Sequence, residues 1–497
     1  MTESLWESSA RIGSYPRLER DGVTVDVAIV GGGITGATAA ILLKLAGRRV
    51  ALVEARTIGS GVTGGTTAHV TEIIDTRYHA LESKFGRDGA ALAARSSRHA
   101  IEQIAALEAR LALGSDFERV PGYLYTERDD QIDEIKRELD AARRAGIRAE
   151  LASVPLPIEV KAGIRFDDQA QFHPLRYLSS LAARIAGNDS HVFENSRVLT
   201  VDEGDPCVLH FENGATLRAD RVILATHAPI NRVLLHTKVA HYRSYVVSGR
   251  VERAPHGLFW DTEDPYHYTR AQRVEGETHL IVGGEDHKTG QEEDTEAPFE
   301  RLREYAARLG LQEISHRWSA QVIEPVDGLP FIGRNAGSEH VYVATGYSGN
   351  GMTFGTLAGM ILKDACLDTE NPYAELYTAT RIKPLASLVS FIGENVDFPM
   401  HLLSDRVRPP NAKSVDEVGP GEGKIVRVKG ERLAVYRDDG GRLHAVSPVC
   451  THLGCHVAFN TAERTWDCPC HGSRFDVDGG VIDGPAVTPL GRRRVEE

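Results

Sequence analysis

Residues 25–36, VDVAIVGGGITG, contain the pattern that determines the expected fold. The apolar run 25–30 is typical of a buried strand, and the motif G-x-G-x-x-G follows it directly. A helix is expected at 37–46 and a second strand at 49–54, ending on the acidic Glu54. A strand, glycine turn, helix and strand with an acidic residue about twenty positions on is typical of a Rossmann-like α/β domain that binds a dinucleotide.

Each glycine of this motif has its own role. Gly31 allows the tight turn, Gly33 lets the backbone approach a pyrophosphate, and Gly36 lets the helix pack closely on the strand. The helix N-terminus then faces the phosphates with its partial positive charge, and Glu54 is expected to bind the ribose hydroxyls. The motif alone does not distinguish NAD from FAD. No second fingerprint for a dedicated NAD(P)H site is evident.

A second pattern lies near the C-terminus, where two short segments each place a cysteine beside a histidine. The first has Cys450-x-His452 and the second has Cys468-x-x-His471. This is the ligand pattern of a Rieske [2Fe-2S] centre, in which two thiolates hold one iron and two imidazoles hold the other. Tetrahedral zinc is the alternative, but zinc sites more often show Cys-x-x-Cys or His-x-x-x-His pairs. The pattern favours one-electron transfer.

Composition sets limits on the class of protein. The 497 residues suit two or three domains, and the net charge of −13, without a basic stretch, disfavours nucleic acids and anionic membranes as partners. Of six cysteines, Cys207 and Cys366 lie alone in apolar surroundings and are expected to be buried. Low cysteine use and the polar N-terminus predict a cytoplasmic protein without a signal peptide or a membrane span.

Four segments beyond the fingerprint resemble the D-amino acid oxidase and glycine oxidase superfamily of FAD-dependent oxidoreductases. They occur in the order of that superfamily, and the resemblance spans about residues 23–370. They are the small-residue loop 59–68, the strand 219–226, the segment 327–333 and the loop with its helix start, 344–352. The resemblance implies FAD as the cofactor, bound also by Thr66, Thr67, His69, Gly346, Gly349, Gly351 and Met352.

Two histidines bear on the flavin site. Gly65-Thr66-Thr67-Ala68-His69 resembles the setting in which some dimethylglycine and sarcosine dehydrogenases attach a histidine covalently to the flavin, with a non-bonded histidine as the alternative. His227 stands where this superfamily often has glycine, and either contacts substrate or packs in its loop.

The resemblance also implies the domain plan. An FAD domain, 23–395, is interrupted by an α+β substrate domain at about 79–150 and 235–320. A linker follows at 396–420, and a small all-β Rieske domain covers 421–497. Periodicity predicts helices at 88–113 and 131–145, and strands at 117–125, 242–250, 279–284, 424–428, 433–436 and 443–446.

Candidate catalytic residues follow from their place in the resemblance. Tyr268 and Arg270 lie where the superfamily places an aromatic and a basic residue over the flavin, and His173 begins a helix close to it. Arg243 is expected where the chain passes under the pocket. An arginine could bind a substrate carboxylate in a bidentate fork. A structural role in the scaffold is the alternative for each of them.

The C-terminal segment, from about residue 421, resembles Rieske proteins of quinol-oxidising complexes and small Rieske ferredoxins. That resemblance implies a disulfide between Cys455 and Cys470 that clamps the two cluster loops. Ser473 matches a serine that donates to the cluster, whereas Phe475 replaces a tyrosine donor. One missing donor predicts a reduction potential in the middle of the Rieske range.

These expectations combine into one function. Flavin-dependent oxidation of a small amine or amino acid would pass electrons to the cluster and then to an external acceptor. The reverse direction, with the cluster feeding the flavin from an outside donor, is the first alternative. A redox-sensing or scaffold protein without turnover is the second. The two-part order resembles a bacterial family with a Rieske module fused to a flavin amine oxidoreductase.

Overall fold

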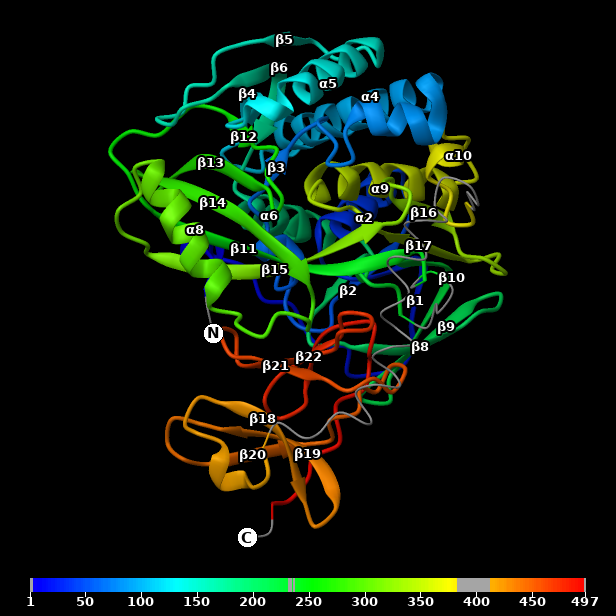
Figure 1. Ribbon diagram of the computed structural model, residues 1–497. Helices are drawn as coiled ribbons and strands as arrows, with labels where there is room; N and C mark the ends of the chain where they lie inside the picture. The colour runs from blue at the N-terminus through cyan, green and yellow to red at the C-terminus, as the bar shows by residue number, and fades with distance from the viewer. Residues whose placement is uncertain (1–2, 231–234, 236, 382–411, 496–497) are drawn as a thin grey trace.

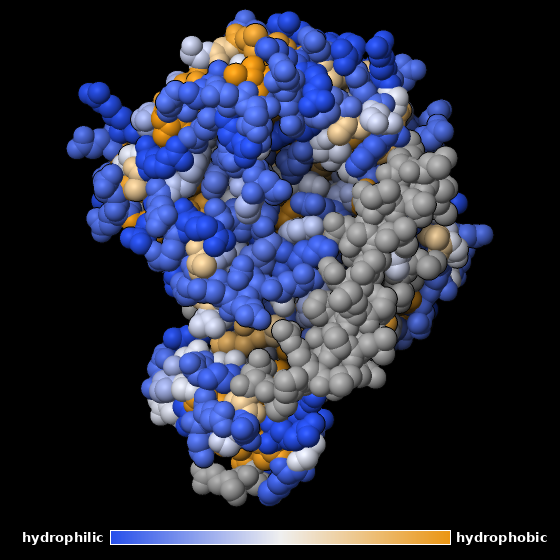
Figure 2. All heavy atoms as spheres, in the orientation of Figure 1, coloured by the Kyte–Doolittle hydropathy of each residue, from blue (hydrophilic) through white to orange (hydrophobic). Residues whose placement is uncertain are grey.

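The computed structural model describes residues 3–230, 235, 237–381 and 412–495. Two lobes are visible in Figure 1: a large one above, and a small one below that is built from the orange and red C-terminal chain. Figure 2 shows polar residues over most of the same face and a narrower waist where the lobes meet. Within the described residues, no helix combines the length and apolar composition needed to cross a bilayer.

The first sheet of the large lobe is the expected Rossmann-like sheet. Its strands lie in the order β16-β17-β10-β1-β2-β7, and β8 and β9 extend it beside β10. The pairs between β17, β10, β1, β2 and β7 are parallel, and β16 pairs antiparallel with β17. The strands are β1 (Val23–Val30), β2 (Val50–Val53), β7 (His191–Phe193), β8 (Val198–Asp202), β9 (Cys207–Phe211), β10 (Thr216–Leu224), β16 (Phe331–Arg334) and β17 (Val341–Thr345).

Three helices complete this layer: α2 (Ile34–Leu45), α6 (Pro174–Ile185) and α9 (Gly351–Cys366). Helices α2 and α9 pack so closely that a Cβ on Gly355 would lie 2.6 Å from a methyl carbon of Ile34. The close contact brings the N-terminal ends of α2 and α9 together beside the ends of the parallel strands, where ligands bind in open α/β sheets.

A second, mostly antiparallel sheet forms the remainder of the large lobe. Its order is β15-β11-β14-β13-β12-β4-β6-β3, with β5 beside β6. The strands are β3 (His69–Val70), β4 (Glu118–Thr126), β5 (Ala149–Leu151), β6 (Ala162–Gln171), β11 (Val239–Arg250), β12 (Leu258–Trp260), β13 (His267–Val274), β14 (Glu277–Lys288) and β15 (His316–Pro325). This sheet extends past the expected boundary at residue 150, because β6 pairs with β4 along most of its length.

Further helices lie around this second sheet (Figure 1). They are α4 (Tyr78–Leu111), which is kinked at Gly86, α5 (Ile132–Arg144) and α8 (Ala297–Arg308). Short helices α1 (Leu5–Ser9), α3 (Val62–Gly65) and α10 (Ala374–Tyr377) and the 3₁₀ turn Asp129–Gln131 complete the large lobe. The predicted helices and strands of this lobe are all present, with ends shifted by a few residues or, for α4, by ten.

The small lobe contains two short sheets, as expected for an all-β domain. Their orders are β18-β19-β20 and β21-β22-β23-β24. The strands are β18 (Gly423–Val428), β19 (Glu431–Arg437), β20 (Leu443–Val446), β21 (Ala458–Asn460), β22 (Thr465–Asp467), β23 (Arg474–Phe475) and β24 (Val481–Asp483), preceded by a 3₁₀ turn at Val415–Glu417. Most of the expected linker, up to residue 411, lies outside the described residues.

Candidate active site and cluster site

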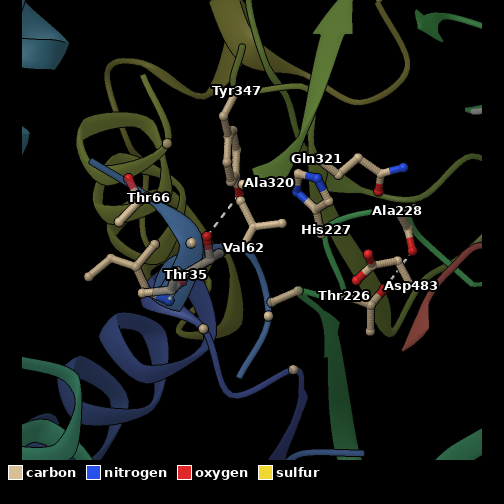
Figure 3. Close-up of a pocket in the computed structure, with 18 of the residues that line it drawn as sticks. Thr35, Val62, Thr66, Thr226, His227, Ala228, Ala320, Gln321, Tyr347 and Asp483 are labelled. Atoms are coloured by element: carbon tan, nitrogen blue, oxygen red, sulfur yellow. Dashed lines mark hydrogen bonds between the residues drawn. The ribbon is translucent and has the colours of Figure 1, made fainter. Parts of the chain in front are cut away.

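One elongated cavity runs between the two sheets of the large lobe and reaches the small lobe. Its walls carry the fingerprint glycines, the loop around Thr66, strand β15 and the start of α9. Figure 3 shows Thr35, Tyr347 and Gln321 facing this space, with Asp483 of the small lobe beside Thr226 and Ala228. The expected cofactor residues Gly31, Gly33, Glu54, Thr66, Thr67, His69, Gly349, Gly351 and Met352 all line it.

The fingerprint turn requires glycine at the predicted positions. Gly31 has a φ of +113°, and a Cβ there would lie 2.3 Å from the carbonyl oxygen of Ala225. A Cβ on Gly36 would lie 1.9 Å from the carbonyl oxygen of Gly31. The Glu54 carboxylate accepts the backbone N–H of Gly32 at 2.8 Å, which fixes it at the cavity edge. This cradle fits the adenosine diphosphate half of FAD.

The loop beside the flavin site is held from outside by two indoles. Trp6 of α1 donates its Nε1–H to the carbonyl oxygen of Thr66 at 2.5 Å. Trp318 of β15 donates to the carbonyl oxygen of Gly65 at 2.8 Å. These bonds fix the backbone that carries Thr66 and Thr67 along the cavity.

His69 lies buried at the end of this loop. Its Nδ1 is 2.9 Å from the hydroxyl of Thr67, and its ring centroid is 5.2 Å from that of Trp260. Burial first, and then the charge of Arg270, lower the pKa of His69 to about 3, so the imidazole is neutral. Covalent attachment of the flavin here stays a prediction, which acid precipitation tests by whether the yellow colour stays with the protein.

The loop before α9 closes the opposite side. Gly346 has a φ of +78°, and the Gly349 N–H donates to the Asp75 carboxylate at 2.5 Å. Helix α9 begins at Gly351, and Gly351 and Met352 line the cavity. The N-terminus of this helix therefore presents partial positive charge where a flavin ring would gain negative charge on reduction.

Of the three expected catalytic residues, Tyr268 alone lines the cavity. Its hydroxyl is 2.7 Å from the Ser244 hydroxyl. Arg270 is fully buried behind the wall, where it donates to the carbonyl oxygen of Ala68 at 2.8 Å and lies over the Trp6 ring. The guanidinium of Arg270 is used here in holding the flavin loop, and its direct contact with substrate stays a prediction.

His173 and Arg243 also differ from expectation. His173 caps α6 by accepting the N–H of Arg176 on Nδ1 at 3.3 Å, and it does not line the cavity. Arg243 is 1% exposed and forms an ion pair of 2.5 Å with Glu463 of the small lobe. Both positions have structural roles. His227, left open from sequence, lines the cavity beside Asp483 (Figure 3).

Other residues of the cavity were not anticipated. Asp75, Ser244, Trp260 and Gln321 line it, although they come from separate strands and loops. No spacing in the sequence connects them, because strand pairing alone brings them together.

The four expected cluster ligands come together at the tip of the small lobe. The Cys468 thiol hydrogen-bonds to Cys450 and lowers the pKa of the Cys450 thiol to about 7. The rings of His452 and His471 lie 5.0 Å apart at 89°, and burial lowers the pKa of His471 to about 4. Two adjacent buried thiols and two neutral imidazoles fit the donor set of a Rieske [2Fe-2S] cluster.

The loops around these ligands agree with the Rieske resemblance. Cys455 and Cys470 form the expected disulfide. The Ser473 hydroxyl hydrogen-bonds to Cys450, whereas the fully buried Phe475 offers no donor. A mid-range reduction potential stays a prediction for a redox titration.

The cluster loops are docked against the flavin cavity. Gln321 of β15 lines the cavity and donates its Nε2–H to the carbonyl oxygen of Gly472 at 2.7 Å. Gly472 is the neighbour in sequence of the cluster ligand His471. One buried side chain therefore connects the two sites.

A buried charge network holds the two lobes together. Glu463 of the small lobe accepts from Arg243 of the large lobe and from Arg474. Arg474 also pairs with Asp467 at 3.1 Å and with Asp483 at 3.2 Å. Asp483 and its neighbours Ile482 and Gly484 in turn line the flavin cavity, so the small lobe forms part of its wall.

The fold and the two sites define a flavoprotein oxidoreductase with an attached iron–sulfur domain. Residues 26–365 match the family model "FAD dependent oxidoreductase", and residues 410–493 match the Rieske [2Fe-2S] domain. The chain therefore belongs to the FAD dependent oxidoreductase family, carries a C-terminal Rieske domain, and takes FAD and a [2Fe-2S] cluster as cofactors.

Known proteins share this organisation in whole or in part. The putative Rieske 2Fe-2S iron-sulfur protein YhfW of Bacillus subtilis (strain 168) is 34% identical over 98% of this chain and 97% of its own length. The cytochrome b6-f complex iron-sulfur subunit of Chlorobaculum tepidum is 41% identical, over 16% of this chain and 44% of its own.

Solved structures resemble the large lobe. Glycine oxidase from Geobacillus kaustophilus has a TM-score of 0.63 at 20% identity, covering 73% of this chain and all of its own. L-Proline dehydrogenase from P. horikoshii has a TM-score of 0.59 at 17% identity, covering 74% of this chain and 98% of its own. At these identities the likeness shows the shared fold.

Proposed function

We propose that this protein oxidises a small amine or amino acid at the flavin site and transfers the electrons through the Rieske centre to an external acceptor. The observation that carries the proposal is the Gln321 side chain, which lines the flavin cavity and hydrogen-bonds to Gly472 beside the cluster ligand His471. Because the Rieske domain is fused to the flavin domain, it acts at high effective concentration, and the two centres do not have to meet by diffusion.

The type of substrate is supported by the walls of the cavity. FAD, when bound, accepts a hydride from the carbon next to the substrate nitrogen, so no nucleophile is required. Ser244 and Tyr268 are hydrogen-bonded to each other at 2.7 Å and can orient a small polar molecule. By their names, the structural neighbours act on glycine and on L-proline, which supports chemistry at a carbon–nitrogen bond.

The chain's own residues hold the cofactors. Gly31, Gly33 and Gly36 with Glu54 would bind the dinucleotide, and the N-terminus of α9 would face the flavin ring. The cluster would be held by Cys450, His452, Cys468 and His471. With two free buried cysteines at residues 207 and 366, we place the protein in the cytoplasm.

An anaerobic titration of the purified holoprotein tests the function. N-methyl amines, polyamines and amino acids are added one at a time, while flavin bleaching is followed optically and the reduced cluster by electron paramagnetic resonance. Reduction of both centres by one compound supports the proposal. Reduction of both by a reduced ferredoxin, and by none of the amines, contradicts it and supports the reverse direction.

A further inference from the structure

The substrate end of the cavity is walled by three aromatic residues. Trp260, Tyr266 and Tyr268 line it, and the centroids of the Tyr266 and Tyr268 rings lie 5.6 Å apart. The His69 ring meets the Tyr268 ring edge-on at 5.7 Å. Aromatic faces grouped in this way attract cations, because the ring faces carry negative charge density.

A carboxylate lies within this aromatic wall. Asp75 lines the cavity, and its Oδ2 accepts the Gly349 N–H at 2.5 Å. A Cβ placed on Gly349 would lie 2.8 Å from this oxygen and 3.0 Å from the Tyr266 hydroxyl. The carboxylate and the phenol therefore face the same small space above Gly349.

A second acid lies behind the wall. Both carboxylate oxygens of Asp286 on β14 are shielded from solvent and lack a hydrogen-bond partner of good geometry. The pairing of β11 with β14 shifts register between Arg243 and Tyr245, which places Ser244, a lining residue, opposite Glu285 and Asp286. Burial is the main reason that the pKa of Asp286 is raised to about 8, and the nearby charges of Glu324 and Asp75 add to it. A buried acid in this setting lacks a counter-charge.

No cationic side chain lines this end of the cavity among the described residues, although the charge of Arg77 acts on Asp75 and partly offsets the effect of burial, which raises the pKa of that carboxyl. The arginines that line the cavity are Arg56 and Arg197, and they lie at the other end with Glu54 and Asp483. Arg56 donates to the carbonyl oxygen of Ser60 and Arg197 to that of Val481. Arg270 is hydrogen-bonded to the flavin loop, and Arg243 forms an ion pair with Glu463, as described above. A substrate carboxylate would therefore meet acids here.

We propose that this end of the cavity binds a cationic amine that has no carboxylate beside the reacting carbon. Asp75 contacts the ammonium, the rings of Trp260, Tyr266 and Tyr268 surround it, and Asp286 behind Ser244 ionises when a cation lies nearby. This inference rests on the proposed function, since it assigns the substrate class of the same site. It excludes the α-amino acids that the broader proposal includes.

Binding of a probe that cannot be oxidised tests the charge preference directly. The holoprotein is titrated with tetramethylammonium, with the neutral tert-butanol and with acetate, and the flavin absorption spectrum reports binding. We expect tetramethylammonium to bind at least about tenfold more tightly than either of the others, equivalent to about 1.4 kcal/mol. Tighter binding of acetate, or equal binding of all three, overturns the inference.

Two variants locate the preference. D75N and D286N each remove one acid at nearly constant shape, and we expect each to weaken tetramethylammonium binding while tert-butanol binding stays the same. D130N, at an exposed aspartate of the 3₁₀ turn that pairs with Arg128, is the matched control. Unchanged cation binding in both variants contradicts the inference. If D75N does not retain flavin, tetramethylammonium binding to D286N and to wild type still tests the inference.

Turnover separates this inference from the function on which it rests. Benzylamine and phenylglycine share one skeleton and differ by the carboxylate, and each is added anaerobically to the holoprotein. Faster flavin reduction by benzylamine supports both proposals. Reduction by phenylglycine alone retains the function and overturns the cationic-amine site. Tetramethylammonium binding, with no reduction by any amine or amino acid, retains the site and overturns the oxidase function.

Discussion

At the scale of single residues, Gln321 is the contact that joins the two redox sites. It is 1% exposed, it lines the flavin cavity, and its amide donates to the carbonyl oxygen of Gly472. Gly472 lies within the Rieske segment, whereas Gln321 belongs to no recognisable motif. A fully buried polar side chain is costly unless it is hydrogen-bonded, so this bond also fixes the position of the side chain.

Replacing Gln321 by leucine should slow electron transfer between the centres. The carbonyl oxygen of Gly472 loses its donor and the close contact to the cluster loop, while the flavin cradle is unchanged. We expect cluster reduction to slow by about tenfold, equivalent to about 1.4 kcal/mol in the barrier. Rapid mixing with substrate separates flavin bleaching from the appearance of the reduced cluster. Q312L, at an exposed glutamine, is the control, and equal rates in Q321L and wild type would contradict the role.

The buried Asp286 should make stability depend on pH. Its pKa is about 8 in the folded protein, mainly through burial, against 3.8 as the ordinary value. Between about pH 4 and about pH 8 the unfolded chain has released this proton, whereas the folded protein still holds it. The free energy of unfolding of wild type therefore falls as pH rises through this window, and the loss is constant above about pH 8. Asp75, Glu285 and Glu324 face the group and add to the effect, whereas Ser244 opposes it.

The variant D286N should lack this loss of stability. Its melting temperature, relative to wild type, is expected to rise between about pH 5 and about pH 8, by an amount equivalent to about 1–3 kcal/mol. Differential scanning fluorimetry across this range is the measurement. A constant difference between the two proteins at all pH values would argue against a raised pKa.

At the scale of elements, strand β15 connects every part of the machinery. Trp318 supports the flavin loop, Ser319 donates to Glu463 of the small lobe at 2.6 Å, and Gln321 reaches the cluster loop. Ala320 and Val322 line the cavity between them. Helix α1 supports the same flavin loop from outside through Trp6, which is fully buried.

Truncating Trp6 should loosen the flavin loop. W6A removes the donor to Thr66, the ring that lies over Arg270 and a large buried volume, at a cost of about 3–5 kcal/mol. W6F retains most of the ring and loses the donor, so its effect should be smaller. We expect faster release of FAD, followed by flavin fluorescence, with the spectrum of the reduced cluster unchanged. Equal FAD release in W6A and wild type would show that α1 is dispensable for the loop.

At the scale of the whole molecule, the Rieske domain is part of the flavin site. Glu463 bridges Arg243 and Arg474 across the interface, and Ile482, Asp483 and Gly484 line the flavin cavity. The orange and red chain in Figure 1 therefore approaches the large lobe with its cluster end. Docking brings the cluster loops beside the flavin cavity and closes one side of that cavity.

Neutralising Glu463 should release this docking. E463Q leaves Arg243 and Arg474 buried without their shared counter-charge, and breaking a buried pair typically costs about 3–5 kcal/mol. We expect cluster reduction to slow and FAD release to become faster in the same variant, because the same interface positions the cluster loops and closes the flavin cavity. Stopped-flow absorbance and flavin fluorescence measure them. E431Q, at an exposed pair with Arg493, is the control. Loss of one property without the other would mean that docking does not couple them.

The sequence by itself determined the features that depend on contiguous residues. The fingerprint glycines, Glu54, the four cluster ligands and most strands could be predicted, because a turn, a ligand pair or a buried strand is encoded within a few neighbouring positions. The disulfide between Cys455 and Cys470 followed from resemblance and is present.

The tertiary structure alone decided which polar residues meet in the cavity. Arg243 and Arg270 look alike in sequence as candidates for a substrate carboxylate, yet one pairs with Glu463 and the other holds the flavin loop. Asp75 and Gln321 carry no motif and line the cavity. The physical reason is that long-range strand pairing and lobe docking set these contacts, and a side chain's partner depends on what packing brings within reach.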